Sequence, residues 1–152
     1  MMIDTKAYGA TEIDERQRIT LQKGLFGFED YREFALLDSD HPPFYWFQSL
    51  SEREIAFVLI DPHIFRPDYS PCISAEDLEA LGIIGEGDEN LLVFSIVTIP
   101  EEQKRMTANL QGPLLVNRKT RQGRQIISGD ERWHVRHSII EEMKHAGGDS
   151  AC

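Results

Sequence analysis

The chain has 152 residues, of which 41% are hydrophobic and 28% are charged, and its formal net charge is −10. This balance is typical of one folded globular domain and excludes a disordered chain, and no run of about 20 apolar residues indicates a transmembrane helix. Because the N-terminal residues are polar, we expect no secretory signal and no membrane partner, and we predict a cytoplasmic protein.

The acidic residues are concentrated in residues 1–100, where the charge balance is −12, whereas residues 101–152 have a balance of +2. An acidic surface repels phosphate backbones and attracts basic proteins, so we expect no direct nucleic-acid binding. Acidity is also a common route to solubility, and the charge alone does not choose between solubility and a basic partner.

Short apolar segments predict strands in the first half of the chain, either because they alternate with polar residues or because they are unbroken. The predicted strands are an edge strand within 1–11, then 18–21, 34–37, 44–50 and 55–60. Between them, residues 24–29 predict a tight turn with its hydrophobic side chains packed down, and Ser51 with Glu54 predicts one helical turn. Ser74 as N-cap and Gly82 as the stop predict a helix over 74–81.

In the second half, residues 91–99 form the longest apolar run and predict the central strand. Residues 113–128 predict a β-hairpin with its turn at 118–123, and a last strand is expected at 133–135. Ser138 begins a helix that extends to about His145.

The stretch 106–117 contains neither a nucleophile nor a set of metal ligands. We therefore predict that it has a structural role, which favours a binding protein. Pro113 fits the first position of a strand, and Asn109 and Asn117 fit places where side-chain amides cap or turn the backbone. Together the elements predict a mainly β fold, and several strands without polar alternation fit a small closed barrel or a tight sandwich with helices on the outside. Of the two, we predict a small closed antiparallel β-barrel-like domain over residues 1–146, with a few short peripheral helices. Residues 147–152 are expected to form a flexible C-terminal tail.

Two histidines and two cysteines are candidates for metal binding or catalysis. His134 and His137 are three apart, so on a strand they would point to opposite faces, and surface histidines are the better interpretation. Cys72 lacks an activating setting for a nucleophile. Cys72 and Cys152 do not make a disulfide framework; a link between them stays open, although a terminal cysteine is more often a free thiol. We expect no catalytic residue, no metal and no cofactor.

A basic cluster spans the predicted hairpin turn and consists of Arg118, Lys119, Arg121 and Arg124. A solvated turn is the favoured interpretation, and contact with an acidic partner patch comes second. RNA binding would require interleaved aromatic residues, which the cluster lacks.

Several short motifs occur in a fixed order along the chain. They are Gly24-Leu25-Phe26-Gly27-Phe28-Glu29, Phe47-Gln48-Ser49, Asp68-Tyr69, the long strand before Pro100, Thr107-x-Asn109-Leu110-x-x-Pro113 with Asn117, and Gly123-x-Gln125. This ordered set resembles the flagellar assembly factor FliW family from about Ile3 to about His137. The chain departs from the family at Phe26, Phe47 and Gly112, where Pro, Leu and Ala are common.

The resemblance implies a non-enzymatic partner switch that binds flagellin and the RNA-binding translational regulator CsrA, and so antagonises CsrA repression of flagellin translation. It also suggests six partner-binding residues, namely Phe28, Glu29, Gln48, Tyr69, Asn109 and Asn117. The alternative from another class is a small-ligand-binding or hydrolytic β-barrel, which would require a cleft lined by convergent polar groups.

Overall fold

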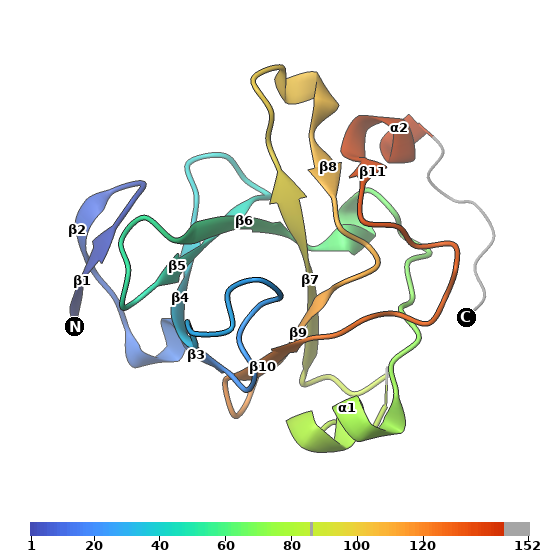
Figure 1. The fold of residues 1–152 in the computed structure, drawn as a ribbon, viewed down its shortest axis with the longest axis horizontal. Helices are drawn as coiled ribbons and strands as arrows, with labels where there is room; N and C mark the ends of the chain where they lie inside the picture. The colour runs from blue at the N-terminus through green and yellow to red at the C-terminus, as the bar shows by residue number, and fades with distance from the viewer. Residues whose placement is uncertain (86, 145–152) are drawn as a thin grey trace.

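The computed structural model describes residues 1–85 and 87–144, and within them the fold is built almost entirely of β-strands around a barrel (Figure 1). The strands are β1 (Met2–Thr5), β2 (Gly9–Glu12), β3 (Arg18–Leu21), β4 (Glu33–Asp38), β5 (Tyr45–Ser49), β6 (Ala56–Ile60), β7 (Leu91–Thr98), β8 (Thr107–Ala108), β9 (Leu114–Asn117), β10 (Gln122–Gln125) and β11 (His137–Ser138). The helices are α1 (Ala75–Leu81) and α2 (Ile139–Lys144), and 3-10 turns occupy η1 (Glu15–Gln17), η2 (Pro62–Ile64) and η3 (Gln103–Arg105).

Seven of these strands close into the predicted barrel. Strands β3 to β7 pair with their neighbours in chain order, β7 also pairs with β9, β9 with β10, and β10 returns to β3. All of these pairs are antiparallel except β10 with β3, where Gln122 lies opposite Thr20 in a parallel ladder. Strict up-and-down alternation cannot close a ring with an odd number of strands, so one neighbouring pair must be parallel. This pair is the one departure from the antiparallel barrel that the sequence predicts.

The barrel interior is filled by aromatic and aliphatic side chains from every barrel strand except β10, which has none. Phe34 and Phe47 stack face to face, with ring centroids 4.4 Å apart and planes 3° apart, and both are fully buried. Ile19, Leu59 and Leu114 complete this part of the core. Interior positions alternate with exterior ones along each strand, as barrel geometry requires.

A second hydrophobic core lies outside the barrel, against the outer face of β6, β7 and β8. Phe65 and Tyr69 from the segment after η2 pack there with Trp133 and Ile139 from the C-terminal part of the chain. Figure 1 shows these segments, the loop around η2 and the region from β11 to α2, on the same side of β7. Residues from the C-terminal part of the chain therefore cover the outer face of β6, β7 and β8.

The aromatic run at 44–47 is divided between these cores, as a strand with alternating side chains demands. Tyr45 and Phe47 belong to the barrel interior, Phe44 to the second core, and Trp46 packs under the β1–β2 hairpin. All four aromatic side chains of the run therefore serve core packing.

Local capping signals are also confirmed. The Ser74 hydroxyl accepts the N–H of Asp77 at 3.1 Å, and Gly82 ends helix α1 in the left-handed conformation at φ 69°. At the start of α2, the Ser138 hydroxyl accepts the N–H of Glu141 at 3.3 Å. The predicted end of this helix at His145 and the predicted tail at 147–152, with Cys152, lie outside the described residues.

Three predicted elements were wrong in position or kind. The hairpin forms, but β10 is Gln122–Gln125, so its turn is shorter than expected. Residues 51–54 form a turn without a helix, because the Ser49 hydroxyl accepts the N–H groups of Ser51 and Glu52. Residues 133–135 are not a strand. The last strand is β11, which pairs with the two-residue strand β8. No helix in the described part of the chain is long and apolar enough to cross a membrane.

Candidate functional site

Four of the six residues suggested as partner-binding are buried or half-buried and use their side chains for internal hydrogen bonds. The Tyr69 hydroxyl donates to the Leu110 carbonyl at 2.7 Å, and the Gln48 amide accepts the N–H of Lys6 at 2.9 Å. Asn109 Oδ1 accepts the N–H of Gly112 at 2.8 Å, and Asn117 Nδ2 donates to the Leu81 carbonyl at 2.7 Å. Tyr69, Gln48 and Asn117 are buried and Asn109 is half-buried, and the four lie on different elements. The structure does not bring them together, and their role in partner binding stays a prediction.

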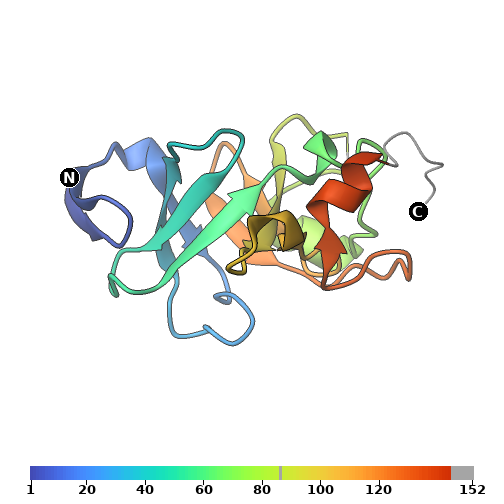
Figure 2. The same cartoon turned by 90° about the horizontal axis from the view of Figure 1, so that it is seen from above.

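The other two, Phe28 and Glu29, lie close together on the loop between β3 and β4. This loop projects from one end of the barrel (Figure 2). The expected packing of its hydrophobic residues holds only in part: Leu25 is buried, but Phe26 is 50% exposed and Phe28 is 37% exposed. The sequence could not show this, because the loop covers a barrel end that has no further layer above it.

The loop is nevertheless held in one shape. The N–H of Phe26 donates to Gln125 Oε1 at 2.8 Å, and the Phe28 ring meets Phe57 edge to face at 5.1 Å. The N–H of Gly27 donates to Glu29 Oε2, and this hydrogen bond is the main reason that the pKa of Glu29 lies below its ordinary value. A rigid loop that presents apolar rings beside a carboxylate is suited to protein contacts.

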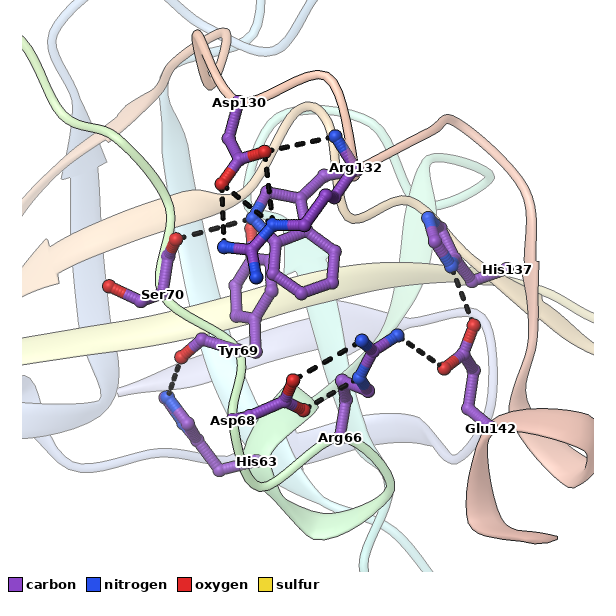
Figure 3. A network of polar contacts seen from close by, with 10 residues as sticks. His63, Arg66, Asp68, Tyr69, Ser70, Asp130, Arg132, His137 and Glu142 are labelled. Atoms are coloured by element: carbon purple, nitrogen blue, oxygen red, sulfur yellow. Dashed lines mark hydrogen bonds and ion pairs between the residues drawn. The ribbon is translucent and has the colours of Figure 1, made fainter. Parts of the chain in front are cut away.

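A polar network clamps the C-terminal segment against the segment that follows η2 (Figure 3). Its centre is the buried Trp133, and the guanidinium carbons of Arg66 and Arg132 lie over its ring, 4.9 and 4.8 Å from the ring centroid. Asp68 holds Arg66 through hydrogen bonds of 2.6 and 3.2 Å, and Asp130 holds Arg132 at 2.7 Å. Each cation is thereby oriented over the aromatic face and neutralised, so the network stabilises the fold and offers no open cationic site.

The network extends to α2 through Glu142. Arg66 Nη1 donates to Glu142 Oε2, and His137 Nδ1 lies 2.8 Å from Glu142 Oε1. Because His137 Nε2 accepts the N–H of His134 at 2.8 Å, the ring proton is on Nδ1 and is donated to Glu142. Burial by itself raises the pKa of Glu142, but the hydrogen bonds from His137 and Arg66 outweigh burial and lower the pKa.

The expectation of two surface histidines is therefore wrong for His137, which is buried, and holds for His134, which is exposed. The backbone bends at Val135, so the two rings come to the same side and stack with centroids 5.3 Å apart. Within residues 1–85 and 87–144 no group of three or more histidine, cysteine and acidic side chains could hold a metal ion.

Sequence reasoning missed the opposite end of the barrel, where the turn between β9 and β10 borders a hollow of about 600 Å³. The hollow is lined by Leu36 and Tyr45, by residues 91–94, and by charged residues that include Arg118 and Arg121. The basic cluster therefore divides. Arg118 and Lys119 are exposed, as expected of a solvated turn, whereas Arg124 forms an ion pair with Asp77 at 2.9 Å.

Comparison with known proteins agrees with this architecture. The sequence profile of the family described as FliW protein matches residues 2–139. The chain is 46% identical over 147 residues to the flagellar assembly factor FliW of Treponema denticola, which covers 97% of this chain and 99% of that protein. The chain belongs to the FliW family. It is also 43% identical over 152 residues to the flagellar assembly factor FliW of Treponema pallidum, over the full length of both chains.

A crystal structure of the flagellar assembly factor FliW shares the fold, with a TM-score of 0.81 at 32% identity, over 91% of this chain and 96% of that one. The FliW profile spans the whole barrel and the second core, and it ends at the first residue of α2.

The three departures from the common FliW pattern have clear places in the structure. Phe47 forms the stacked pair in the barrel interior, and Phe26 is the most exposed ring of the barrel-end loop. At Gly112, an added Cβ would lie 3.1 Å from the amide nitrogens of Asn109 and Gln125. Only the departure at Phe26 changes the surface that a partner would meet.

Proposed function

We propose that this chain is a non-enzymatic cytoplasmic flagellar assembly factor that binds flagellin and CsrA in alternation. The observation that carries the proposal is the similarity over the full length of both chains to a protein named flagellar assembly factor FliW. Export of flagellin would free the factor, which would then sequester CsrA and lift the repression of flagellin translation.

The barrel-end loop supports a role in binding an amphipathic helix. Phe26 and Phe28 are exposed on a backbone held by Gln125 and by the left-handed Gly24, at φ 72°. An amphipathic helix places its apolar face against such rings, and a preformed loop loses little conformational entropy when it binds. We therefore assign flagellin, through its amphipathic helical ends, to this end of the barrel.

The charge distribution supports a basic second partner. Residues 1–100 carry a balance of −12, and many of their carboxylates are exposed, among them Asp38, Asp40, Glu52 and Glu54. A small RNA-binding dimer has a basic surface, so the negative potential of these carboxylates would steer the dimer toward the factor. Binding to this acidic surface would also lower the affinity of the dimer for RNA. No chemistry at a catalytic residue is needed for this exchange.

The test is calorimetric titration with flagellin and with CsrA from the same organism, each alone and then in competition. The proposal predicts that both bind and that one weakens the binding of the other. Replacing Phe26 and Phe28 with serine should weaken flagellin binding at least about tenfold, since buried aromatic anchors dominate interface energies. The matched control is Ile84→Ser, which removes a side chain that is 95% exposed on a different loop and should leave flagellin binding unchanged.

Two results would contradict the proposal. If flagellin binds but CsrA does not, the protein is an export chaperone and the acidic surface serves solubility. If neither partner binds, the similarity reports the fold alone, and the alternative of a small-ligand-binding or hydrolytic barrel becomes the hypothesis to test.

A further inference from the structure

The hollow opposite the barrel-end loop is part of a longer groove. Its floor is apolar and is formed by Leu36, Tyr45, Leu92 and Phe94, which all belong to or pack against the barrel interior core. A second hollow of about 360 Å³ adjoins it, because both are lined by Leu36 and Arg121. The two together form an open groove across this end of the barrel.

The rim of the groove carries two arginines without carboxylate partners. Arg118 and Arg121 both come from the turn between β9 and β10, and neither guanidinium forms a hydrogen bond or an ion pair with a described residue. Lys119 on the same turn also has no such partner among the described residues, but of this turn only Arg118 and Arg121 line the groove.

The other charged residues of the groove compensate one another. Asp61 Oδ1 lies 2.8 Å from His63 Nδ1, and His63 Nε2 lies 3.0 Å from the Tyr69 carbonyl. Since both ring nitrogens face acceptors, the protonated imidazolium fits this site, and the hydrogen bond to Asp61 raises the pKa of His63. In the second hollow Asp14 pairs with Arg16 at 3.4 Å. The uncompensated charge of the groove therefore comes from Arg118 and Arg121.

The backbone at Arg121 adds a further observation. Arg121 has φ 61° and is the one non-glycine residue with positive φ in the described part of the chain. Its N–H donates to the Asn117 carbonyl and its carbonyl accepts the N–H of Thr20, so this conformation is held on both sides. Glycine would adopt it without steric strain, whereas arginine lowers the stability of the fold.

We propose that this groove binds a short acidic segment of a partner protein. A bulky apolar side chain of the segment would lie on the floor, and carboxylates on either side of it would pair with Arg118 and Arg121. Guanidinium groups bind carboxylates through two parallel hydrogen bonds, which the free forks of these two residues can provide. The site goes beyond the proposed switch, since it defines a ligand of the opposite charge to the basic partner expected for the acidic surface.

The experiment measures fluorescence anisotropy of a short labelled peptide in which leucine alternates with glutamate, titrated with the full chain. A second peptide has glutamine in place of every glutamate. We expect the glutamate peptide to bind at least about tenfold more tightly, since charge-assisted hydrogen bonds are about twice as strong as neutral ones.

Variants assign the binding to the rim. Arg118→Gln and Arg121→Gly should each weaken binding of the glutamate peptide at least about tenfold. Arg121→Gly should at the same time raise the midpoint of thermal unfolding. The matched control is Lys119→Gln, which removes the same charge from the same turn but does not line the groove, and it should leave binding unchanged.

Three outcomes would overturn the proposal. One is that the wild-type chain does not bind the glutamate peptide. Another is that the glutamine peptide binds equally well, which would leave only an apolar contact. The third is that Lys119→Gln weakens binding as much as Arg118→Gln, which would show attraction to the charge of the turn without a groove. Because Arg121→Gly keeps or gains stability, loss of binding in this variant cannot be explained by unfolding.

Discussion

Arg66 Nη1 donates to Glu142 Oε2 over 2.7 Å, and this contact joins residues that are 76 positions apart in the chain. The same guanidinium lies over the ring of Trp133, so one side chain links the segment after η2, the C-terminal loop and helix α2. Both partners of the ion pair are largely buried, at 19% and 17% side-chain exposure. The outer wall of the second core therefore depends on a polar clamp as well as on apolar packing.

Replacing Glu142 with alanine should lower the free energy of unfolding by about 2 kcal/mol, because Arg66 and His137 lose a hydrogen-bonded partner in a partly buried site. Urea unfolding followed by tryptophan fluorescence measures the change. The control is Glu141→Ala on the same helix, whose pair with Lys144 is exposed, and it should change stability by less than about 0.5 kcal/mol. Equal effects of the two substitutions would contradict the clamp.

The clamp should also be sensitive to acid. Because the pKa of Glu142 is lower in the folded chain than its ordinary value of 4.5, its stabilising effect is complete above that value and is lost as the pH falls through the lower, folded value. The stability difference between the wild-type chain and Glu142→Gln should therefore be largest near neutral pH and narrow below pH 4.5. Urea unfolding at a series of pH values tests this, and a difference that does not change with pH would disprove it.

Ser95 on β7 carries the one buried side-chain oxygen or nitrogen without a hydrogen-bond partner among the described residues. Its hydroxyl has lost water and gained no partner, so Ser95→Ala should raise the free energy of unfolding by about 1 kcal/mol. The comparison is Ser49→Ala, which removes a buried hydroxyl that accepts two backbone N–H groups and should destabilise the chain by a similar amount. The prediction fails if both substitutions destabilise the protein.

The barrel-end loop depends on Gly24. A Cβ at this position would lie 2.7 Å from the Cα of Glu29, and its φ is 72°, so Gly24→Ala should cost at least about 2 kcal/mol. Gly27 also has positive φ, at 86°, but an added Cβ would meet nothing within 4 Å, and Gly27→Ala should cost only about 1 kcal/mol. Thermal unfolding of the two variants separates the backbone clash from the conformational strain. Equal losses of stability in the two variants would show that the clash at Gly24 does not contribute.

Local signals in the sequence were reliable where neighbouring residues determine the structure. Ser74 and Gly82 bound α1 because capping hydrogen bonds and left-handed backbone act within a single turn. The strands at 18–21 and 55–60, and the hairpin at 113–128, follow from apolar patterning and turn chemistry. The closed barrel was inferred from several short strands that lack polar alternation. The amides of Asn109 and Asn117 turn the backbone as expected.

The sequence by itself therefore determined most of the barrel strands, the N-terminal caps of α1 and α2 and the barrel class, because these depend on side-chain alternation and on hydrogen bonds between near neighbours. Only the tertiary structure decided that β10 lies parallel to β3, that His137 is buried beside Glu142, and that Arg118 and Arg121 border an apolar groove while Arg124 is paired with Asp77. Each of these depends on contacts between residues far apart in the chain. Such contacts form only when the barrel closes, and no local pattern of residue types encodes which distant groups the closure brings together.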